Sequence, residues 1–174
     1  MRRRSHIIGG ANITLKEDVY TEKWKQLLAC LAVPLAARGL SAWLSRKGMK
    51  AFGALHKPPL PPPAWLFPVV WAVLYLLMAI GMAMVWNADQ AHAKPARNLY
   101  IVQLVVNLLW PFFFFRWEMW GFAVIWLLLL IALVMVMALR FEQISPKAAY
   151  LQIPYLIWLC FAAYLNIAIW LLNR

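Results

Sequence analysis

A run of residues without a single charged side chain, from 120 to 139, decides what kind of fold this chain can adopt. A helix needs about 20 predominantly apolar residues to cross the hydrocarbon core of a bilayer. The composition agrees, because 65% of the residues are hydrophobic and 13% are charged, whereas soluble domains average about 45–50% and about 25%. A water-soluble bundle would need polar faces at helical spacing, and this run has none. We therefore expect an integral membrane protein.

Further apolar segments extend this expectation to an all-α integral membrane bundle of five transmembrane helices. The additional predicted spans are residues 24–44, 68–86, 99–115 and 151–172. Residues 23–174 would form this single domain, after a polar and disordered N-terminal tail at 1–22. Residues 87–98 and 140–147 are predicted to be polar connections. Residues 116–119 are predicted to form a tight hairpin that makes the third and fourth helices antiparallel neighbours.

The formal net charge of +11 does not indicate nucleic-acid binding. The basic residues are scattered between the apolar segments, as Lys94 and Arg97 illustrate. There they would anchor helix ends to anionic headgroups. The expected partner is the lipid bilayer, without nucleic acid, and the expected location is the bacterial cell membrane as a multi-pass protein.

Catalytic and metal-binding patterns find little support in the sequence. The acidic residues all lie in the tail or the connections, and the histidines lie in different connections. Cys30 and Cys160 fall within predicted spans, where free cysteine behaves as a small apolar residue. We therefore expect a protein that is not an enzyme, with no metal site, no catalytic residues and no obligatory cofactor.

The connection between the first two predicted spans, residues 45–64, is long and contains closely spaced prolines at 58–63. Proline fixes φ and removes a backbone donor, so this stretch is expected to be stiff and extended rather than helical. It leads into aromatic residues at Trp65, Phe67 and Trp71. Such a loop is a candidate lid over an apolar ligand.

Polar and aromatic side chains recur on one face of each of three predicted spans. Gln103, Asn107 and Trp110 follow at spacings of four and three. Trp71 and Tyr75 are four apart, and Trp158, Ala162, Leu165 and Asn166 share a face in the last span. Apolar walls with a few orienting polar groups are typical of ligand pockets. Alternatively, Gln103, Asn107 and Asn166 only tie helices together.

Three segments, taken together and in order, resemble the TspO/MBR family of tryptophan-rich sensory proteins and translocator proteins. They are KP…PPAWLFPVVWAVLY at 57–75, QLVVNLLWPFFF at 103–114 and PYLIWLCFAAYLNIAIWLLN at 154–173. The resemblance implies a five-helix bundle whose first loop covers a pocket. It also implies a porphyrin or haem-type tetrapyrrole as ligand, with sterol or benzodiazepine-site ligands in some members.

The resemblance also implies which residues would line the pocket. Phe52 stands where many members have tyrosine, and Phe122 stands where the mammalian pattern has tryptophan. Carried over position by position, the ligand-binding residues would be Phe52, Pro62, Phe67, Trp71, Tyr75, Gln103, Asn107, Trp110, Phe122, Trp158, Ala162 and Leu165.

Two departures from the family pattern concern sterols and self-association. Ile167 takes the position of the tyrosine in the animal cholesterol motif, which argues against cholesterol recognition by that motif. The family forms homodimers through small residues on the third helix, and Asn98 and Val102 stand near those positions here. A homodimer is expected from the resemblance, without support from these two residues.

The expected function is binding of porphyrin-like tetrapyrroles for transport or for sensing. One alternative is an enzyme-like degradation of the bound porphyrin that needs light or an oxidant and uses tryptophan as a radical relay. Another is a structural partner protein whose assembly with other membrane proteins is gated by ligand.

Overall fold

The computed structural model of the protein describes residues 65–86 and 90–173, with isolated positions at 28, 32, 39, 55, 56, 62, 63 and 88. All regular secondary structure in this part of the chain is helical. Apart from its three isolated positions, the predicted first span lies outside the described residues, as do the tail 1–22 and the candidate residue Phe52.

The described chain forms four long helices and two short ones. They are α2 (Leu66–Trp86), α3 (Gln90–Pro111), the π-helix η2 (Phe112–Arg116), α4 (Trp120–Glu142), α5 (Pro146–Tyr150) and α6 (Ile153–Leu172). Four segments are long and apolar enough to cross a membrane: Leu66–Trp86, His92–Arg116, Trp120–Glu142 and Pro146–Leu172. The second to fifth predicted spans are thereby confirmed, and the protein is a multi-pass all-α membrane protein.

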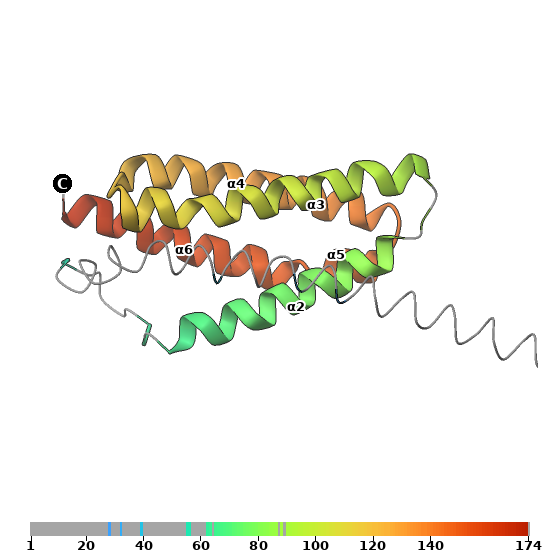
Figure 1. Cartoon of the computed structure of the whole chain (residues 1–174), viewed down its shortest axis with the longest axis horizontal. Coiled ribbons are helices and arrows are strands. Elements are labelled where there is room, and N and C mark those ends of the chain that lie inside the picture. Colours follow the sequence, from blue (N-terminus) through green and yellow to red (C-terminus); the bar gives the residue numbers. More distant parts are fainter. Residues whose placement is uncertain are drawn as a thin grey trace, which may run out of the picture.

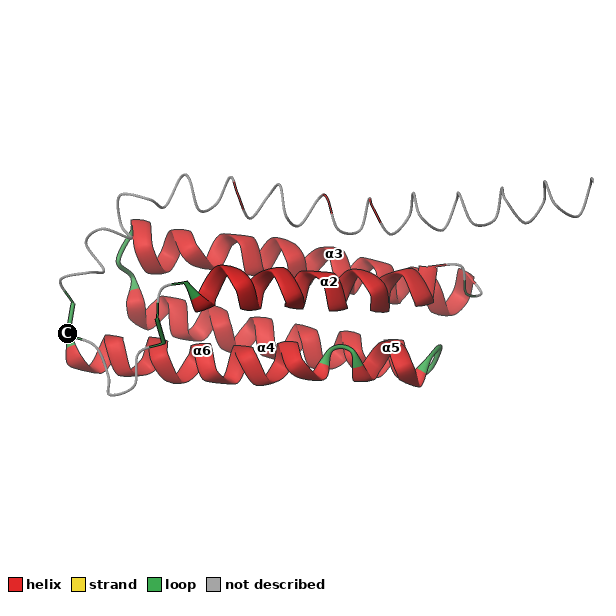
Figure 2. Ribbon diagram, turned by 90° about the horizontal axis from the view of Figure 1, so that it is seen from below, coloured by secondary structure: helices red, strands yellow, loops and turns green. Residues whose placement is uncertain are grey.

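The helices pack along their lengths into an elongated bundle (Figure 1). The helix α4 contacts both α3 and α6, while α2 contacts α3, α5 and α6. Figure 2 shows α2 and α3 on one side of the bundle, with α5 and α6 on the other. Buried residues of α2, α3, α4 and α6 form one core cluster, which includes Trp71, Tyr75 and Tyr155.

The helix α2 is apolar on its buried face and on its outer face alike. Its buried residues recur every three or four positions, and they are Trp71, Leu74, Tyr75, Met78, Ala79, Gly81, Met82 and Val85. Outward-facing Val69, Val73 and Leu76 are exposed. A helix that is hydrophobic all round suits a bilayer, where lipid rather than water covers the outer face.

The predicted polar connection at 87–98 is wrong in extent, because α3 already begins at Gln90. The helical part of this segment, 90–98, contains three alanines, and alanine has the highest intrinsic helix propensity. Ala93 and Ala96, three residues apart, are completely buried. Pro95 lies in the second turn of α3, where its missing N–H costs one backbone bond without ending the helix. The helix α3 therefore begins four residues after the end of α2.

The connection between α4 and α6 also differs from the prediction. The helix α4 runs to Glu142, and the short helix α5 starts at Pro146, so the predicted link at 140–147 contains only three residues outside helices. Ser145 is extended, with φ −152° and ψ 107°, and precedes Pro146 in the first turn of α5. Proline suits this position because the first N–H groups of a helix have no intrahelical partner.

The predicted hairpin between the third and fourth helices is confirmed. The helix α3 ends at Pro111, which has no N–H and removes an α-helical bond, and the chain widens into η2. The N–H of Trp117 donates to the carbonyl of Phe112 at 2.9 Å, and Met119 donates to Phe113 at 2.9 Å. Glu118, at φ 54°, completes the reversal.

Gly81 provides a test of the close packing between α2 and α5. A Cβ at Gly81 would collide with Nε2 of Gln152 and approach the carbonyl oxygen of Ala148 to 3.1 Å. We expect Gly81→Ala to lower the free energy of unfolding by roughly 1–3 kcal/mol, the usual effect of overpacking. Thermal unfolding in mild detergent measures this.

Gly39→Ala is the matched control for this prediction. Gly39 is also helical, and a Cβ there would have nothing within 4 Å. Alanine at an open helical position stabilises by roughly 1 kcal/mol relative to glycine. A Gly81→Ala protein that unfolds at the wild-type temperature or above would contradict the packing described here.

Candidate functional site

Four polar side chains from three helices form a continuous hydrogen-bonded chain in the middle of the bundle. The Tyr75 hydroxyl donates to Oδ1 of Asn107 at 3.4 Å, and Nδ2 of Asn107 donates to the Tyr155 hydroxyl. The Tyr155 hydroxyl donates in turn to Oε1 of Gln103 at 3.2 Å. We call these four residues the polar chain. None of them is more than 2% exposed.

The polar chain leaves one strong donor unused. Nε2 of Gln103 is buried and has no hydrogen-bond partner among the described residues. A buried donor without a partner costs roughly 1–3 kcal/mol. A ligand acceptor that reached this amide would offset that cost, so Gln103 Nε2 is the point of the polar chain best suited to orient a ligand.

The structure brings Gln103 and Asn107 together with Tyr155, a residue that the sequence analysis does not single out. Gln103 and Asn107 are one turn apart on α3, as their spacing indicates, and both face Tyr155 on α6. Tyr155 lies three residues before Trp158, on the stripe that continues to Asn166. A phenol inside a membrane span is itself a polar group, and counting it as one would have identified Tyr155.

Aromatic side chains of α2 and α6 adjoin the polar chain. Phe67 and Trp158 meet edge to face, with ring centroids 5.8 Å apart and an interplanar angle of 71°. Trp71 lies 6.2 Å from Tyr155, also edge to face, and 5.5 Å from Tyr75. We call Phe67, Trp71 and Trp158 the aromatic wall. These residues extend from the first turn of α2, at Phe67, to Trp71, which contacts Tyr75 and Tyr155 of the polar chain.

Trp110 belongs to a second group of aromatic residues at the end of α3. Its ring stacks on Phe114 with centroids 4.8 Å apart and meets Phe115 edge to face at 5.8 Å. It packs against the main core and also against the smaller cluster of Phe114, Ala123 and Ile169. Its indole N–H is buried without a partner among the described residues. Trp110 therefore lies between the two cores.

Phe122 lies at the seam between α3 and α4. It is 39% exposed, and its ring contacts Phe113 at 4.8 Å and Trp126 at 5.9 Å. Trp126 joins the same seam by donating its indole N–H to the carbonyl of Val106 at 2.8 Å. Phe122 thus packs between α3 and α4. Its ring contacts with Phe113 and Trp126 do not connect it to the aromatic wall.

The remaining candidates are less enclosed. Ala162 and Leu165 are half-buried on α6, and Ala162 packs against the main core. Pro62 is half-buried just before α2. Asn166 is buried, and neither of its amide atoms has a hydrogen-bond partner among the described residues. The alternative that these polar residues only tie helices together therefore fits Gln103 and Asn107 but not Asn166.

His56, ten residues before the start of α2, is hydrogen-bonded to the end of α6. The side chain of Asn173 accepts the N–H of His56 at 3.0 Å and donates to the carbonyl of His56 at 2.9 Å. Its amide nitrogen also donates to the carbonyl of Ile169 at 2.9 Å. Leu55 packs against the cluster around Phe114. We call this set of contacts the Asn173 clasp, which sequence reasoning did not predict.

The described residues offer no cluster of side chains suited to binding a metal ion. Within residues 65–86 and 90–173 there is no group of three His, Cys, Asp or Glu side chains that could hold a metal ion. The groups at the candidate site are amides, phenols and indoles. These groups can stack on, enclose and hydrogen-bond an organic ligand.

The geometry defines a multi-pass membrane protein with a buried aromatic and amide-lined interior between three helices. The chain belongs to the TspO/MBR family, whose family model matches residues 29–171. It is 35% identical to the translocator protein of Bos taurus over 155 residues, covering 87% of this chain and 92% of that protein. It is 33% identical to the tryptophan-rich protein TspO of Chlorobaculum tepidum, with coverages of 83% and 90%. Protein CrtK of Rhodobacter capsulatus is 34% identical, with coverages of 70% and 78%.

Tyr155→Phe tests whether the polar chain holds α3 against α6. The substitution keeps the ring but leaves Nδ2 of Asn107 and Oε1 of Gln103 without the Tyr155 hydroxyl. We expect a loss of roughly 1–3 kcal/mol in the free energy of unfolding. Unfolding in mild detergent measures it, with Tyr164→Phe on the exposed face of the same helix as control. Equal, small shifts in both variants would refute the assigned role.

Asn173→Ala tests the Asn173 clasp. The variant removes both hydrogen bonds to His56, each worth about 1 kcal/mol. We expect the His56 amide to exchange with deuterium roughly 5–30 times faster, as read by amide exchange and mass spectrometry. Asn98→Ala, a change at an exposed asparagine of α3, should leave this rate unchanged. An unchanged rate in Asn173→Ala would mean that the clasp does not hold the loop.

Proposed function

We propose that this protein binds a flat, largely apolar macrocycle of the porphyrin type between α2, α3 and α6, for transport or for sensing. The observation that carries the proposal is the continuity of the aromatic wall with the polar chain. Trp71 contacts both Tyr75 and Tyr155, whose hydroxyls belong to the polar chain. Ligand sites commonly combine such aromatic surface with a few fixed polar groups.

Each part of this interior has a distinct role in the proposed complex. Phe67, Trp71 and Trp158 provide aromatic faces and edges against the plane of the macrocycle. The unused Nε2 of Gln103 donates to a ligand acceptor. Asn107 and Tyr155 hold Gln103 in position. Trp110, with its own unused N–H, extends the binding surface toward the end of α3.

The family supports a role in binding rather than catalysis. The relatives carry names such as translocator protein and tryptophan-rich protein TspO, which are not the names of enzymes. Binding followed by release across or within the membrane needs no catalytic group. Porphyrin specificity, the homodimer and the contributions of Phe52, Pro62, Phe122, Ala162 and Leu165 stay predictions.

The aromatic contacts also favour the enzyme-like alternative as a second candidate. Trp71 lies 5.5 Å from the Tyr75 ring and 6.2 Å from the Tyr155 ring, so three oxidisable side chains adjoin one another. With light and molecular oxygen as the oxidant, such a group could relay electrons from a bound porphyrin. A new porphyrin product that forms on illumination in air, and only when Trp71 is present, would favour degradation over simple binding.

The proposed pocket is tested by replacing both tryptophans of the aromatic wall. Trp71→Leu with Trp158→Leu removes two aromatic rings and keeps apolar side chains in their place. We expect about 1–3 kcal/mol of lost binding free energy, or roughly five- to 150-fold weaker binding. Titration of protoporphyrin in the dark, followed by the shift of its main absorption band, measures the affinity.

Trp117→Leu serves as the matched control for this titration. Trp117 is an exposed tryptophan in the hairpin after η2, and its recorded ring contacts are to Phe112 and Phe113. We expect this variant to bind protoporphyrin as the wild type does. Unchanged affinity in the double variant, with correct folding by circular dichroism, would refute the proposed pocket.

A further inference from the structure

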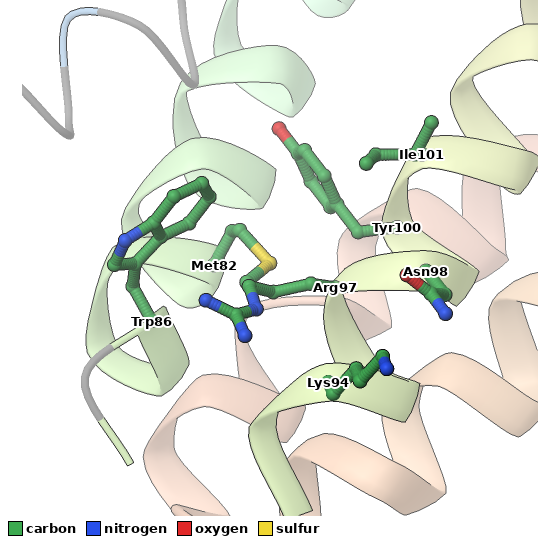
Figure 3. Close-up of a pocket in the computed structure, with 7 residues that line it drawn as sticks. All are labelled: Met82, Trp86, Lys94, Arg97, Asn98, Tyr100 and Ile101. Carbon is green, nitrogen blue, oxygen red and sulfur yellow. The ribbon is translucent and has the colours of Figure 1, made fainter. Parts of the chain in front are cut away.

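A basic groove lies between the end of α2 and the beginning of α3. It has a volume of about 460 Å³ and is lined by Met82, Trp86, Lys94, Arg97, Asn98, Tyr100 and Ile101 (Figure 3). None of these residues belongs to the aromatic wall or the polar chain. The groove is thus a separate feature from the proposed macrocycle site.

The groove combines positive charge with aromatic surface. In Figure 3 the Arg97 side chain extends from α3 toward Trp86 on α2. The guanidinium carbon lies 5.4 Å from the centroid of the Trp86 ring, which is a cation–π contact. Lys94, one turn earlier on α3, is exposed beside it. A planar guanidinium with a neighbouring ammonium is a suitable pair of donors for a phosphate.

The position of the groove along the spans points to the level of lipid headgroups. One candidate span ends at Trp86, and the next begins at His92, so the groove lies where both helices leave the hydrocarbon. Tryptophan and tyrosine are enriched at this depth, and basic side chains there are attracted to anionic lipids.

An apolar track continues from the groove along α3. Ile101, Val105 and Leu109 follow at intervals of four residues and are 58%, 50% and 39% exposed. Residues at this spacing share one face of a helix. The groove is large enough for a headgroup, and this face offers a surface for an acyl chain. Free phosphate would use only the first of these two features.

We propose that the basic groove is a binding site for one anionic phospholipid. Arg97 and Lys94 donate to the headgroup phosphate, Asn98 and the rim of the groove contact the glycerol, and an acyl chain lies along Ile101 and Val105. Trp86 holds the Arg97 guanidinium in place. This proposal is independent of the macrocycle site, since it involves other residues.

The test compares lipid retention by the wild type and a double variant, Lys94→Gln with Arg97→Gln. The protein is purified in a neutral detergent, mixed with phosphatidylglycerol, and analysed by native mass spectrometry to titrate the first bound lipid. A basic residue near the surface contributes about 1 kcal/mol to binding anionic lipid, so we expect roughly thirtyfold weaker binding in the double variant.

The matched control is Arg140→Gln with Lys147→Gln. These exposed residues lie at the end of α4 and on α5, outside the groove, and removing them lowers the net charge equally. We expect the control to retain phosphatidylglycerol like the wild type. Equal losses in both double variants would mean diffuse electrostatic attraction and would overturn the proposal.

Two further ligands complete the test. Phosphatidylcholine with the same acyl chains should bind far more weakly than phosphatidylglycerol, and equal binding would overturn the proposal. Millimolar inorganic phosphate should not displace the lipid, and displacement would reassign the groove as a site for free anions. If the double variant unfolds, the exposed Lys94→Gln change alone should still weaken binding roughly fivefold.

Discussion

The hydroxyl of Tyr155 is the group on which the interior of this bundle depends. It accepts a hydrogen bond from Asn107 and donates one to Gln103, so a single oxygen bonds to two amides on another helix. In a bilayer no water is available to replace such bonds, and an unsatisfied polar group is costly. The polar chain therefore fixes the register of α3 against α6 and, through Tyr75, draws α2 to the same point. Because these bonds use most of the polar groups but not Nε2 of Gln103, the same arrangement that joins the helices also leaves a donor for a ligand.

The sequence predicts the spans because crossing hydrocarbon imposes a length and a composition that can be counted. It also predicts which faces of α2, α3 and α6 meet, because helical spacing places Gln103 with Asn107 and Trp71 with Tyr75. It fails for contacts that depend on three dimensions. Tyr155 was overlooked because a phenol in an apolar span looks like one more large hydrophobic residue. The start of α3 was misplaced because polar composition outweighed the alanines that pack there.

The two candidate sites differ in the physics that would select their ligands. The interior between α2, α3 and α6 is apolar and neutral, with amides and phenols that favour a flat ligand carrying few charges. The basic groove where α2 ends and α3 begins is charged, because Lys94 and Arg97 line it. Both candidate sites involve α2 and α3. On α2, for example, Trp71 belongs to the interior site and Trp86 to the groove, and one continuous helix joins them. A lipid at one end and a macrocycle in the middle would thus both bias the packing of α2 against α3.

The Asn173 clasp has a consequence for the order in which the protein is assembled in the membrane. His56 and Asn173 are 117 residues apart in the chain, and every described helix from α2 to α6 lies between them. During synthesis the loop before α2 emerges long before its anchor does. The helices can insert and pair as they are made, but this loop can be fastened only after Asn173 has left the ribosome. The hydrogen bonds between His56 and Asn173 are therefore among the last contacts to form, and until then α2 is held to α6 by contacts such as that of Phe67 with Trp158.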